Sequence, residues 1–401
     1  MPPAIPEIQI HRMPARCRSA LLPCLWSVLP LLLPTTGRAQ AILQVGPGGL
    51  PTIDAALAIA VQGDIVLVAP GSYPAFHATV GVTIRAATPG TVFVAIGSQV
   101  NCPGQTACLA DLDLRFLTVG GSTCELDGCT VTGISGSNGP CLTALNSQLR
   151  LVRSVIGGPG EPPQFAFITQ AGIYADATVV SAVDCTIQGR ERDLLGYFAA
   201  GPGINLVNGS RLHGSNLDLR GGDGATTSYA QPGSALVANA STFWIADSTL
   251  RCGRALGVAG TPRIGCPVVG TGGRFARSSF DPVTCPPSVP VTGTMMGIGM
   301  GTPMASGAPL QIDFLVEPDE WIGVYASPAT ADLVLPDFEQ PIAIDLNGLF
   351  FVGLLIADGS GQATGQWLMP PGFTNTQLWL QGVTTTAWPF QLSAPVGGVI
   401  R

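Results

Sequence analysis

The sequence has 401 residues, which is enough for two or three domains and a large hydrophobic core. Charged residues make up only 11%, whereas Gly (52) and Pro (35) are abundant, a balance that favours strands and turns over long helices. The formal net charge is −7 and all 18 basic residues are Arg. Lys chemistry is therefore excluded, and an acidic chain is poorly suited to bind nucleic acid or an anionic membrane.

The first 41 residues have the features of an export signal. Basic residues at Arg12, Arg16 and Arg18 precede an apolar run over 20–33, and small residues follow at Ala39 and Ala41. We predict a signal peptide over 1–41, with translation starting at Met13, and an extracellular or cell-surface location. The rest of the chain would carry a charge of −10, because −7 loses four Arg and gains one by loss of a Glu. No other stretch is long enough to span a membrane.

A short helix and a strand are predicted directly after the signal. Thr52 is a typical helix N-cap, and Gly63 is a typical stop. Strand Ile65–Ala69 follows. The helix has one apolar face, which we expect to pack against a neighbouring element. This face is formed by Ile53, Ala56, Leu57 and Ala60.

One sequence motif recurs between residues 145 and 252, and each copy starts with an Asx residue between small residues. The Asx residues are Asn146, Asp176, Asn208 and Asn239, with steps of 30, 32 and 31 residues. Apolar residues then alternate with period two, as in strands, so that the copies align in columns. The four columns are Leu149, Val180, Leu212, Phe243; Leu151, Ala182, Gly214, Ile245; Ser154, Cys185, Leu217, Ser248; and Ile156, Ile187, Leu219, Leu250.

Aligned columns are what stacked parallel strands need, because each inward side chain lies about 4.8 Å from its equivalent in the next coil. The Asx residues belong at a bend, where Asn and Asp tolerate left-handed backbone angles. We predict an all-β chain with a right-handed parallel β-helix over 42–255, whose unpaired end is covered by the N-terminal helix.

Nine cysteines remain after the signal, as expected of an exported protein. Cys102 with Cys108, and Cys124 with Cys129, are candidate local disulfides, while Cys252, Cys266 and Cys285 could fasten the segment that leaves the β-helix. Cys129 and Cys185 fall two coils apart in one column, ~9.6 Å, so they should not be bonded to each other.

The residues from Thr52 to Leu57, followed by Gly63 to Tyr73, resemble the opening of secreted pectin-lyase-like β-helix proteins. The resemblance covers roughly Leu50 to Arg254. It implies a right-handed parallel β-helix and admits lyases, hydrolases and inert adhesins alike.

Beyond the repeats, residues 256–307 are rich in Gly, Pro, Ser and Thr and are interpreted as a linker with irregular coil. Residues 308–401 contain strand-like runs separated by turn residues, which predict a small antiparallel β-sandwich. The runs are Leu310–Val316, Trp321–Tyr325, Leu349–Ile356, Gln377–Gln381 and Phe390–Leu392.

The excess length of each repeat predicts where function lies. Each copy of the repeat ends with an aliphatic residue and a nearby Gly, and a long segment follows before the next copy begins. The segments are 157–170, 189–203 and 221–233, so three coils should project loops from one edge. Aromatic rings and carboxylates in these loops are the groups a sugar site uses. The candidate ligand-binding residues are Phe165, Phe167, Tyr197, Phe198 and Tyr229, and the candidate catalytic carboxylates are Glu161, Glu191, Asp193 and Asp223.

Two carboxylates set roughly 5 to 9.5 Å apart would permit glycoside hydrolysis. A lyase would need a Ca²⁺ site and a basic residue. The only candidate carboxylates for the Ca²⁺ site are Asp111 and Asp113, which alternate on one strand and could share a face. Gly222-Asp223-Gly224 resembles a Ca²⁺-binding repeat motif, but a single copy does not predict a calcium site. No other metal or cofactor is implied. His213 is interpreted as a structural histidine.

Three interpretations of function follow. The first is an exported, non-catalytic β-helix protein that binds a polysaccharide or cell-envelope glycan through the stacked loops. The second is a polysaccharide lyase or glycoside hydrolase that uses the same loops. The third is a purely structural envelope protein without a ligand.

Overall fold

The computed structural model describes residues 40–133, 139–157, 171–190, 200–224, 232–256, 262–264, 268–270, 273–276, 278–280, 296–300, 302–333, 335, 338, 340–374, 376–384 and 390–401. All of them belong to one compact unit, Gln40–Arg401.

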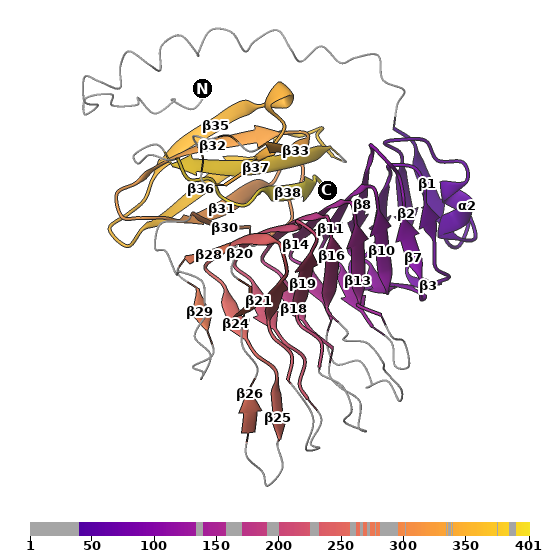
Figure 1. Cartoon of the computed structure of the whole chain (residues 1–401). Coiled ribbons are helices and arrows are strands. Elements are labelled where there is room, and N and C mark those ends of the chain that lie inside the picture. Colours follow the sequence, from indigo (N-terminus) through magenta and orange to yellow (C-terminus); the bar gives the residue numbers. More distant parts are fainter. Residues whose placement is uncertain are drawn as a thin grey trace, which may run out of the picture. The chain divides into compact units, whose positions relative to one another are not determined.

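Three long sheets, in which every strand pair is parallel, form most of this unit (Figure 1). Sheet A has ten strands: β1 (Ile42–Val45), β2 (Ile65–Val68), β5 (Thr83–Ala86), β8 (Thr106–Ala110), β11 (Thr123–Asp127), β14 (Gln148–Val152), β17 (Val179–Val183), β20 (Arg211–Ser215), β23 (Thr242–Ala246) and β28 (Gly273–Ala276). Sheet B has nine: β3 (Gly71–Tyr73), β6 (Val92–Val94), β9 (Asp113–Arg115), β12 (Thr130–Thr132), β15 (Val155–Ile156), β18 (Thr186–Gln188), β21 (Asp218–Arg220), β24 (Thr249–Arg251) and β29 (Ser279–Phe280). Sheet C has eight: β4 (His77–Ala78), β7 (Ser98–Val100), β10 (Leu117–Gly120), β13 (Leu142–Leu145), β16 (Ile173–Asp176), β19 (Ile204–Val207), β22 (Leu236–Ala238) and β27 (Val268–Val269).

The chain visits the sheets in a repeating order. A strand of sheet C is followed by one of sheet A and then one of sheet B before the next coil begins, as in β13, β14, β15 and β16. Each strand pairs with its equivalent one coil away, for example β14 with β11 and β17. This arrangement is consistent with a parallel β-helix.

The predicted columns are confirmed by the strand register. Leu149 pairs with Val180, Val180 with Leu212, and Leu212 with Phe243. The column that begins at Leu151 and the column that begins at Ile156 also follow the predicted order. The column residues of each strand therefore point to the shared interior, and their neighbours in the strand point outward.

The left-handed bend positions differ from the prediction in two coils. Asn146 and Asn208 have φ values of 50° and 54°, as expected. In the other two coils the left-handed residue is Ala177 or Ala240, one position after the predicted Asp176 or Asn239. The strand register aligns Asn146 with Ala177 and not with Asp176, so the Asx column is offset by one residue in those coils.

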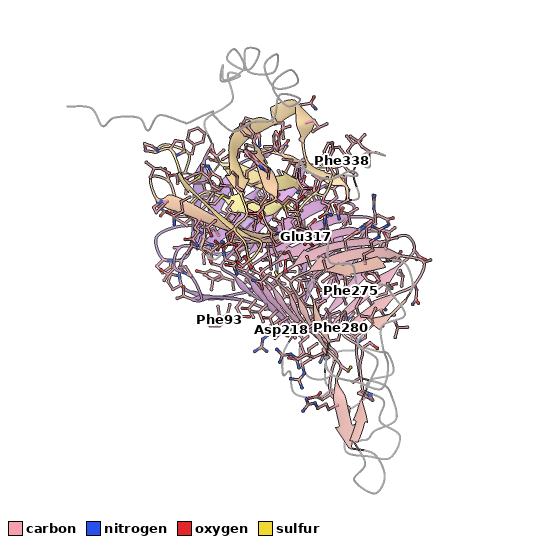
Figure 2. All side chains as sticks on the ribbon, turned by 90° about the vertical axis from the view of Figure 1, so that its left-hand side faces the viewer. Phe93, Asp218, Phe275, Phe280, Glu317 and Phe338 are labelled. Atoms are coloured by element: carbon pink, nitrogen blue, oxygen red, sulfur yellow. The ribbon has the colours of Figure 1, made fainter. Side chains whose placement is uncertain are left out.

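The three sheets continue beyond the point where the columns fade in the sequence. Strands β27, β28 and β29 pair with the coil before them and extend the stack to Phe280, inside the segment interpreted as linker. Phe275 contacts both Phe243 and Phe280, with ring centroids 5.0 Å apart in each pair. Figure 2 labels Phe275 and Phe280. An antiparallel pair, β25 (Arg254–Leu256) with β26 (Pro262–Ile264), precedes this coil.

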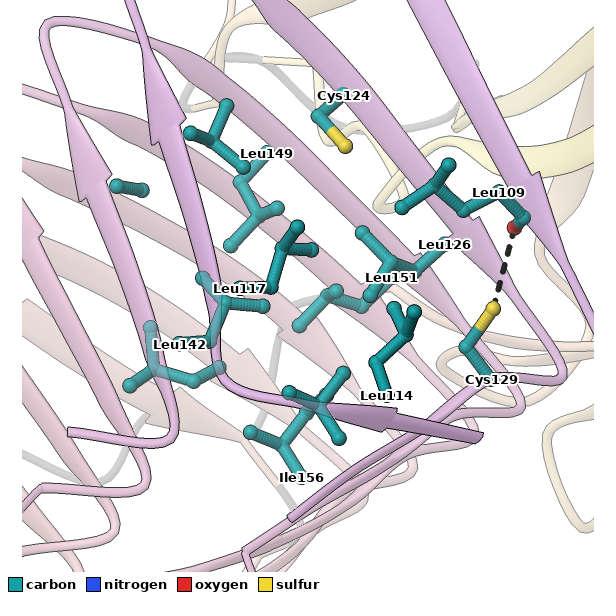
Figure 3. Close-up of a cluster of buried hydrophobic side chains, with 14 of the residues drawn as sticks. Leu109, Leu114, Leu117, Cys124, Leu126, Cys129, Leu142, Leu149, Leu151 and Ile156 are labelled. Atoms are coloured by element: carbon teal, nitrogen blue, oxygen red, sulfur yellow. Dashed lines mark hydrogen bonds between the residues drawn. The ribbon is translucent and has the colours of Figure 1, made fainter. Parts of the chain in front are cut away.

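The interior between the sheets contains cysteines that are free thiols. Figure 3 shows Cys124 and Cys129 among leucines from all three sheets, and Cys129 donates a hydrogen bond to the Leu109 carbonyl at 3.3 Å. Cys102, Cys108, Cys124 and Cys129 are all buried thiols outside any disulfide, so the predicted pairs Cys102–Cys108 and Cys124–Cys129 are wrong.

The geometry explains both corrections. Cys102 lies in the interior cluster, whereas Cys108 lies on the outer face of sheet A and donates a hydrogen bond to Glu125 at 3.0 Å. Cys124 lies within β11 of sheet A, whereas Cys129 follows the bend at Gly128 and donates to the Leu109 carbonyl, so the two side chains enter the interior at different points. Cys129 and Cys185 are also unbonded, as expected, and burial raises the pKa of each thiol to about 12.

A short helix, α2 (Ile53–Leu57), precedes β2. The Thr52 hydroxyl accepts a hydrogen bond from the Ala55 backbone N–H at 3.1 Å, which satisfies one of the unpaired donors of the first turn. Ile53, Ala56 and Leu57 are buried in the same cluster as the interior of the sheets.

The C-terminal residues form antiparallel sheets. One contains β30 (Gly297–Gly299), β31 (Pro309–Leu315) and β36 (Gln362–Leu368) in that order, and another contains β35 (Phe350–Ile356), β32 (Trp321–Ser327), β37 (Gln377–Thr384) and β38 (Val396–Val399). Four of the five predicted runs correspond to β31, β32, β35 and β37. Phe390 and Leu392 make only isolated bridges. A short pair, β33 (Thr330–Leu333) and β34 (Ile342–Ile344), and the 3-10 turn η3 (Leu346–Gly348) complete the region.

These antiparallel sheets pack on the outer face of sheet A. Val152 and Val183 of sheet A belong to the same buried cluster as Phe314, Trp379 and Val396. The Ile298 backbone N–H donates to the Ser215 hydroxyl at 2.8 Å. One face of the parallel stack is thus covered, which leaves the outer faces of sheets B and C for other contacts.

Candidate functional site

The long segments of the repeats all leave the stack at one kind of position. Each follows a strand of sheet B and precedes the next strand of sheet C, as between β15 and β16, β18 and β19, and β21 and β22. Eight of the nine candidate residues lie outside the described residues: Glu161, Phe165, Phe167, Glu191, Asp193, Tyr197, Phe198 and Tyr229. Asp223 is the one that the structure places.

Asp223 is held by two donors. Its Oδ2 lies 2.6 Å from an Arg220 guanidinium nitrogen, and its Oδ1 accepts the Arg254 backbone N–H at 2.8 Å. Arg254 belongs to the next coil, so the carboxylate joins two consecutive coils at the base of a loop. An aspartate with both oxygens engaged in this way is suited to fixing the base of a loop.

Glycines pack the loop bases tightly together. The Gly222 N–H donates to the Gly201 carbonyl at 2.8 Å, Gly233 to Gly222 at 2.9 Å and Gly253 to Gly233 at 2.9 Å. A Cβ at Gly222 would overlap the Arg190 carbonyl oxygen, and one at Gly253 would overlap the Gly222 carbonyl oxygen. Only glycine permits this approach of neighbouring backbones, so the loop bases are fixed to one another by backbone bonds.

Sheet B presents an outward face of polar side chains beside these loop bases. One outward column contains Asp113, Thr130, Val155, Thr186, Asp218, Thr249 and Ser279, and a second contains Arg115, Thr132, Gln188, Arg220 and Arg251. Arg251 and Asp218, which face each other across adjacent coils at 3.4 Å, are both nearly half exposed. Figure 2 marks Phe93 and Asp218, two outward residues of this sheet.

This face offers hydrogen-bonding groups in most of its coils, interrupted by Val155 in the first column. Carboxylates accept protons from hydroxyl groups, guanidinium groups donate, and threonine hydroxyls do both. The groups repeat with the coil spacing of about 4.8 Å. Such an array is suited to an extended, hydroxyl-rich ligand laid across the coils.

The pair Asp111 and Asp113 does not share a face, which corrects the calcium hypothesis. Asp113 points outward from sheet B, whereas Asp111 lies at a bend with φ of 58° and contacts the Arg401 guanidinium at 2.8 Å. Burial raises the pKa of Asp111, and Arg401 opposes that rise. Among the described residues, no group of three or more His, Cys, Asp or Glu side chains is placed to hold a metal ion.

A second polar site lies where sheet A turns into sheet B. A cavity of about 330 Å³ is lined there by Asp184, Asn216 and Asp247 of three consecutive bends, and by Asp313, Gln362 and Thr364 of the antiparallel strands. Asp184 accepts the Met300 N–H and the Asn216 side-chain amide, both at 2.6 Å, so its oxygens are already paired. The sequence signal for this site, which sequence reasoning missed, is the Asx residue that directly precedes Cys185, Leu217 and Ser248.

Buried polar residues lie between sheet A and the antiparallel sheets. Glu125 and Arg150 form an ion pair at 3.1 Å, each 4% exposed, and the Arg150 guanidinium lies 5.2 Å from the centre of the Trp379 ring. Burial raises the pKa of Glu125, although Arg150 lowers it. His213 is buried in the same layer, and burial lowers its pKa to about 4. These groups are inaccessible to a large ligand.

Comparison of the chain with protein-family models finds no match, and comparison with curated proteins finds none either. Within the described part of the chain, no helix is both long enough and apolar enough to cross a membrane.

Proposed function

We propose that this chain is an exported, non-catalytic β-helix protein that binds an extended glycan along the outer face of sheet B and the adjoining loop edge. The observation that carries the proposal is the outward array of Asp, Arg, Thr and Gln beside fixed loop bases. The aromatic residues of the loops would supply stacking surfaces for sugar rings. Export rests on the signal-like segment 1–41.

Several finer features belong to the same proposal. The parallel stack is right-handed, as the resemblance of residues 52–73 to pectin-lyase-like proteins implies, and α2 shields its first coil from strand addition. The antiparallel strands of 296–401 form a β-sandwich that serves attachment to the cell surface. Binding without cleavage is favoured because Asp223 is engaged by Arg220 and Arg254.

A glycan array followed by product analysis tests the proposal. We expect binding without shortened products, and we expect Arg251→Ala to weaken binding about tenfold, since a hydrogen bond to a charged group contributes roughly 1.5 kcal/mol or more. Arg274→Ala is the matched control, because Arg274 is an exposed arginine on sheet A. Cleavage of the bound glycan would show a lyase or hydrolase, and absence of any binding would favour a purely structural envelope protein.

A further inference from the structure

The C-terminal region carries an exposed apolar edge strand. Sheet order places β35 at the edge of its four-stranded sheet, with β32 as its neighbour on one side. Its sequence, Phe-Phe-Val-Gly-Leu-Leu-Ile, contains no charged residue and no proline. Natural edge strands usually carry such residues to prevent pairing with another chain. Among the described residues, no strand pairs with the second edge of β35.

The side chains of β35 are unusually exposed for their type. The exposed fractions are 42% for Phe350, 58% for Phe351, 42% for Leu354 and 54% for Ile356. Leu346 precedes this strand and Leu368 ends the neighbouring β36, and they are 46% and 70% exposed. A single exposed leucine is ordinary, but six such residues on and around one edge strand call for an explanation.

The size of this surface matches what a dimer requires. At about 200 Å² for a whole large apolar side chain, the four β35 residues expose roughly 400 Å² and all six roughly 600 Å². A stable protein interface buries about 800 Å² on each partner. The apolar centre is therefore large enough for such an interface once the polar rim and the backbone edge are added.

Charge limits the choice of partner. Residues 296–401 contain nine carboxylates and one basic residue, Arg401. That arginine contacts Asp111 and Asp127 of the parallel stack. An anionic lipid surface would be repelled by this region. A second copy of β35 carries no charge, so electrostatic repulsion does not oppose pairing at the strand itself.

We propose that β35 is the dimerisation strand of this protein. Two copies of β35 pair antiparallel across a two-fold axis, so that the four-stranded sheets join into one of eight strands. The backbone hydrogen bonds of the free edge are satisfied, and the exposed apolar side chains of each copy cover those of the other. Antiparallel self-pairing is the isologous contact that a two-fold dimer needs.

Sedimentation velocity of the purified protein at 1–100 µM, which brackets a weak to moderate dimer, tests this proposal. We expect a monomer–dimer equilibrium that tightens when the salt concentration rises, because salt screens the repulsion between the acidic regions and leaves apolar contacts intact. Leu354→Lys and Ile356→Lys each place a charge in the pairing surface and should weaken association at least 100-fold. Ile59→Lys is the matched control, since Ile59 is 59% exposed and lies after α2.

Circular dichroism and the thermal unfolding midpoint show whether each variant folds like the parent. A parent protein that stays monomeric at all concentrations would overturn the proposal, as would β35 variants that dimerise like the parent. Association only with vesicles or with a different protein would also overturn it. Glycan binding by the monomer is independent of these results.

Discussion

His213 shows how one buried side chain couples stability to pH. It lies on sheet A beside Trp244, with ring centroids 6.1 Å apart, and its Nδ1 has no hydrogen-bond partner. Arg150 and Arg211 line the same small cavity, and no described residue of its lining carries a carboxylate that would favour the imidazolium form. The neutral imidazole is therefore the form that the fold accepts.

A pH titration of stability checks this reasoning. The pKa of His213 falls from 6.5 to about 4 on folding. Between these values the unfolded chain binds a proton that the folded chain does not, so stability is fully present above pH 6.5 and decreases as the pH falls toward 4. The decrease attributable to His213 should be about 3 kcal/mol over that window. Urea unfolding of the parent and of His213→Leu should give curves that diverge as the pH falls. Parallel curves would contradict the prediction.

At the scale of the element, the columns and the bends differ in how well the sequence predicts them. Columns such as Leu149, Val180 and Leu212 were predicted correctly because a one-residue slip would turn every apolar side chain outward. The bends at Ala177 and Ala240 were missed because a left-handed residue need not be Asx when the neighbouring coils fix its backbone.

The sequence also could not show what covers sheet A. Glu125, Arg150 and His213 occupy the outward positions of their strands, and by alternation they look like residues that face water. They are buried because a distant segment of the chain packs on them. The coil β27–β29 was missed for a different reason: its glycines weaken the period-two pattern.

The glycine-packed loop bases make a prediction at the same scale. Gly222→Ala should destabilise the protein by about 3 kcal/mol, because the new methyl group overlaps the Arg190 carbonyl oxygen and the backbones must separate. Gly120→Ala is the control: nothing lies within 4 Å of a Cβ at Gly120, and its effect should be near zero. Chemical denaturation measures both. Equal effects for the two variants would show that the loop bases tolerate separation.

At the scale of the molecule, a buried ion pair of sheet A lies beneath the antiparallel sheets, where Arg150 also contacts the Trp379 ring. Arg150→Met should cost about 3–5 kcal/mol, because it leaves the buried Glu125 carboxylate without its cation. Adding Glu125→Gln should recover most of that loss. The exposed pair Arg251 and Asp218 provides a control, since Arg251→Met should cost about 1 kcal/mol or less. A double-mutant cycle by urea unfolding gives the coupling energies, and additive effects of the Glu125 and Arg150 changes would refute the prediction.

The distribution of charge differs between the parallel stack and the C-terminal region. Residues 42–295 hold 13 Arg and 15 carboxylates and are nearly neutral, while residues 296–401 have one Arg against nine carboxylates. The acidic C-terminal region would keep copies apart at low salt, and the apolar strand β35 would bring them together once that repulsion is screened.

The closed loop bases have a consequence for how this protein could change over evolutionary time. Backbone hydrogen bonds between Gly201, Gly222, Gly233 and Gly253 join the bases of consecutive loops to one another. A loop can then lengthen, shorten or be replaced without disturbing the columns beneath it. Selection can therefore change the ligand that the loop edge recognises while the stacked strands stay constant.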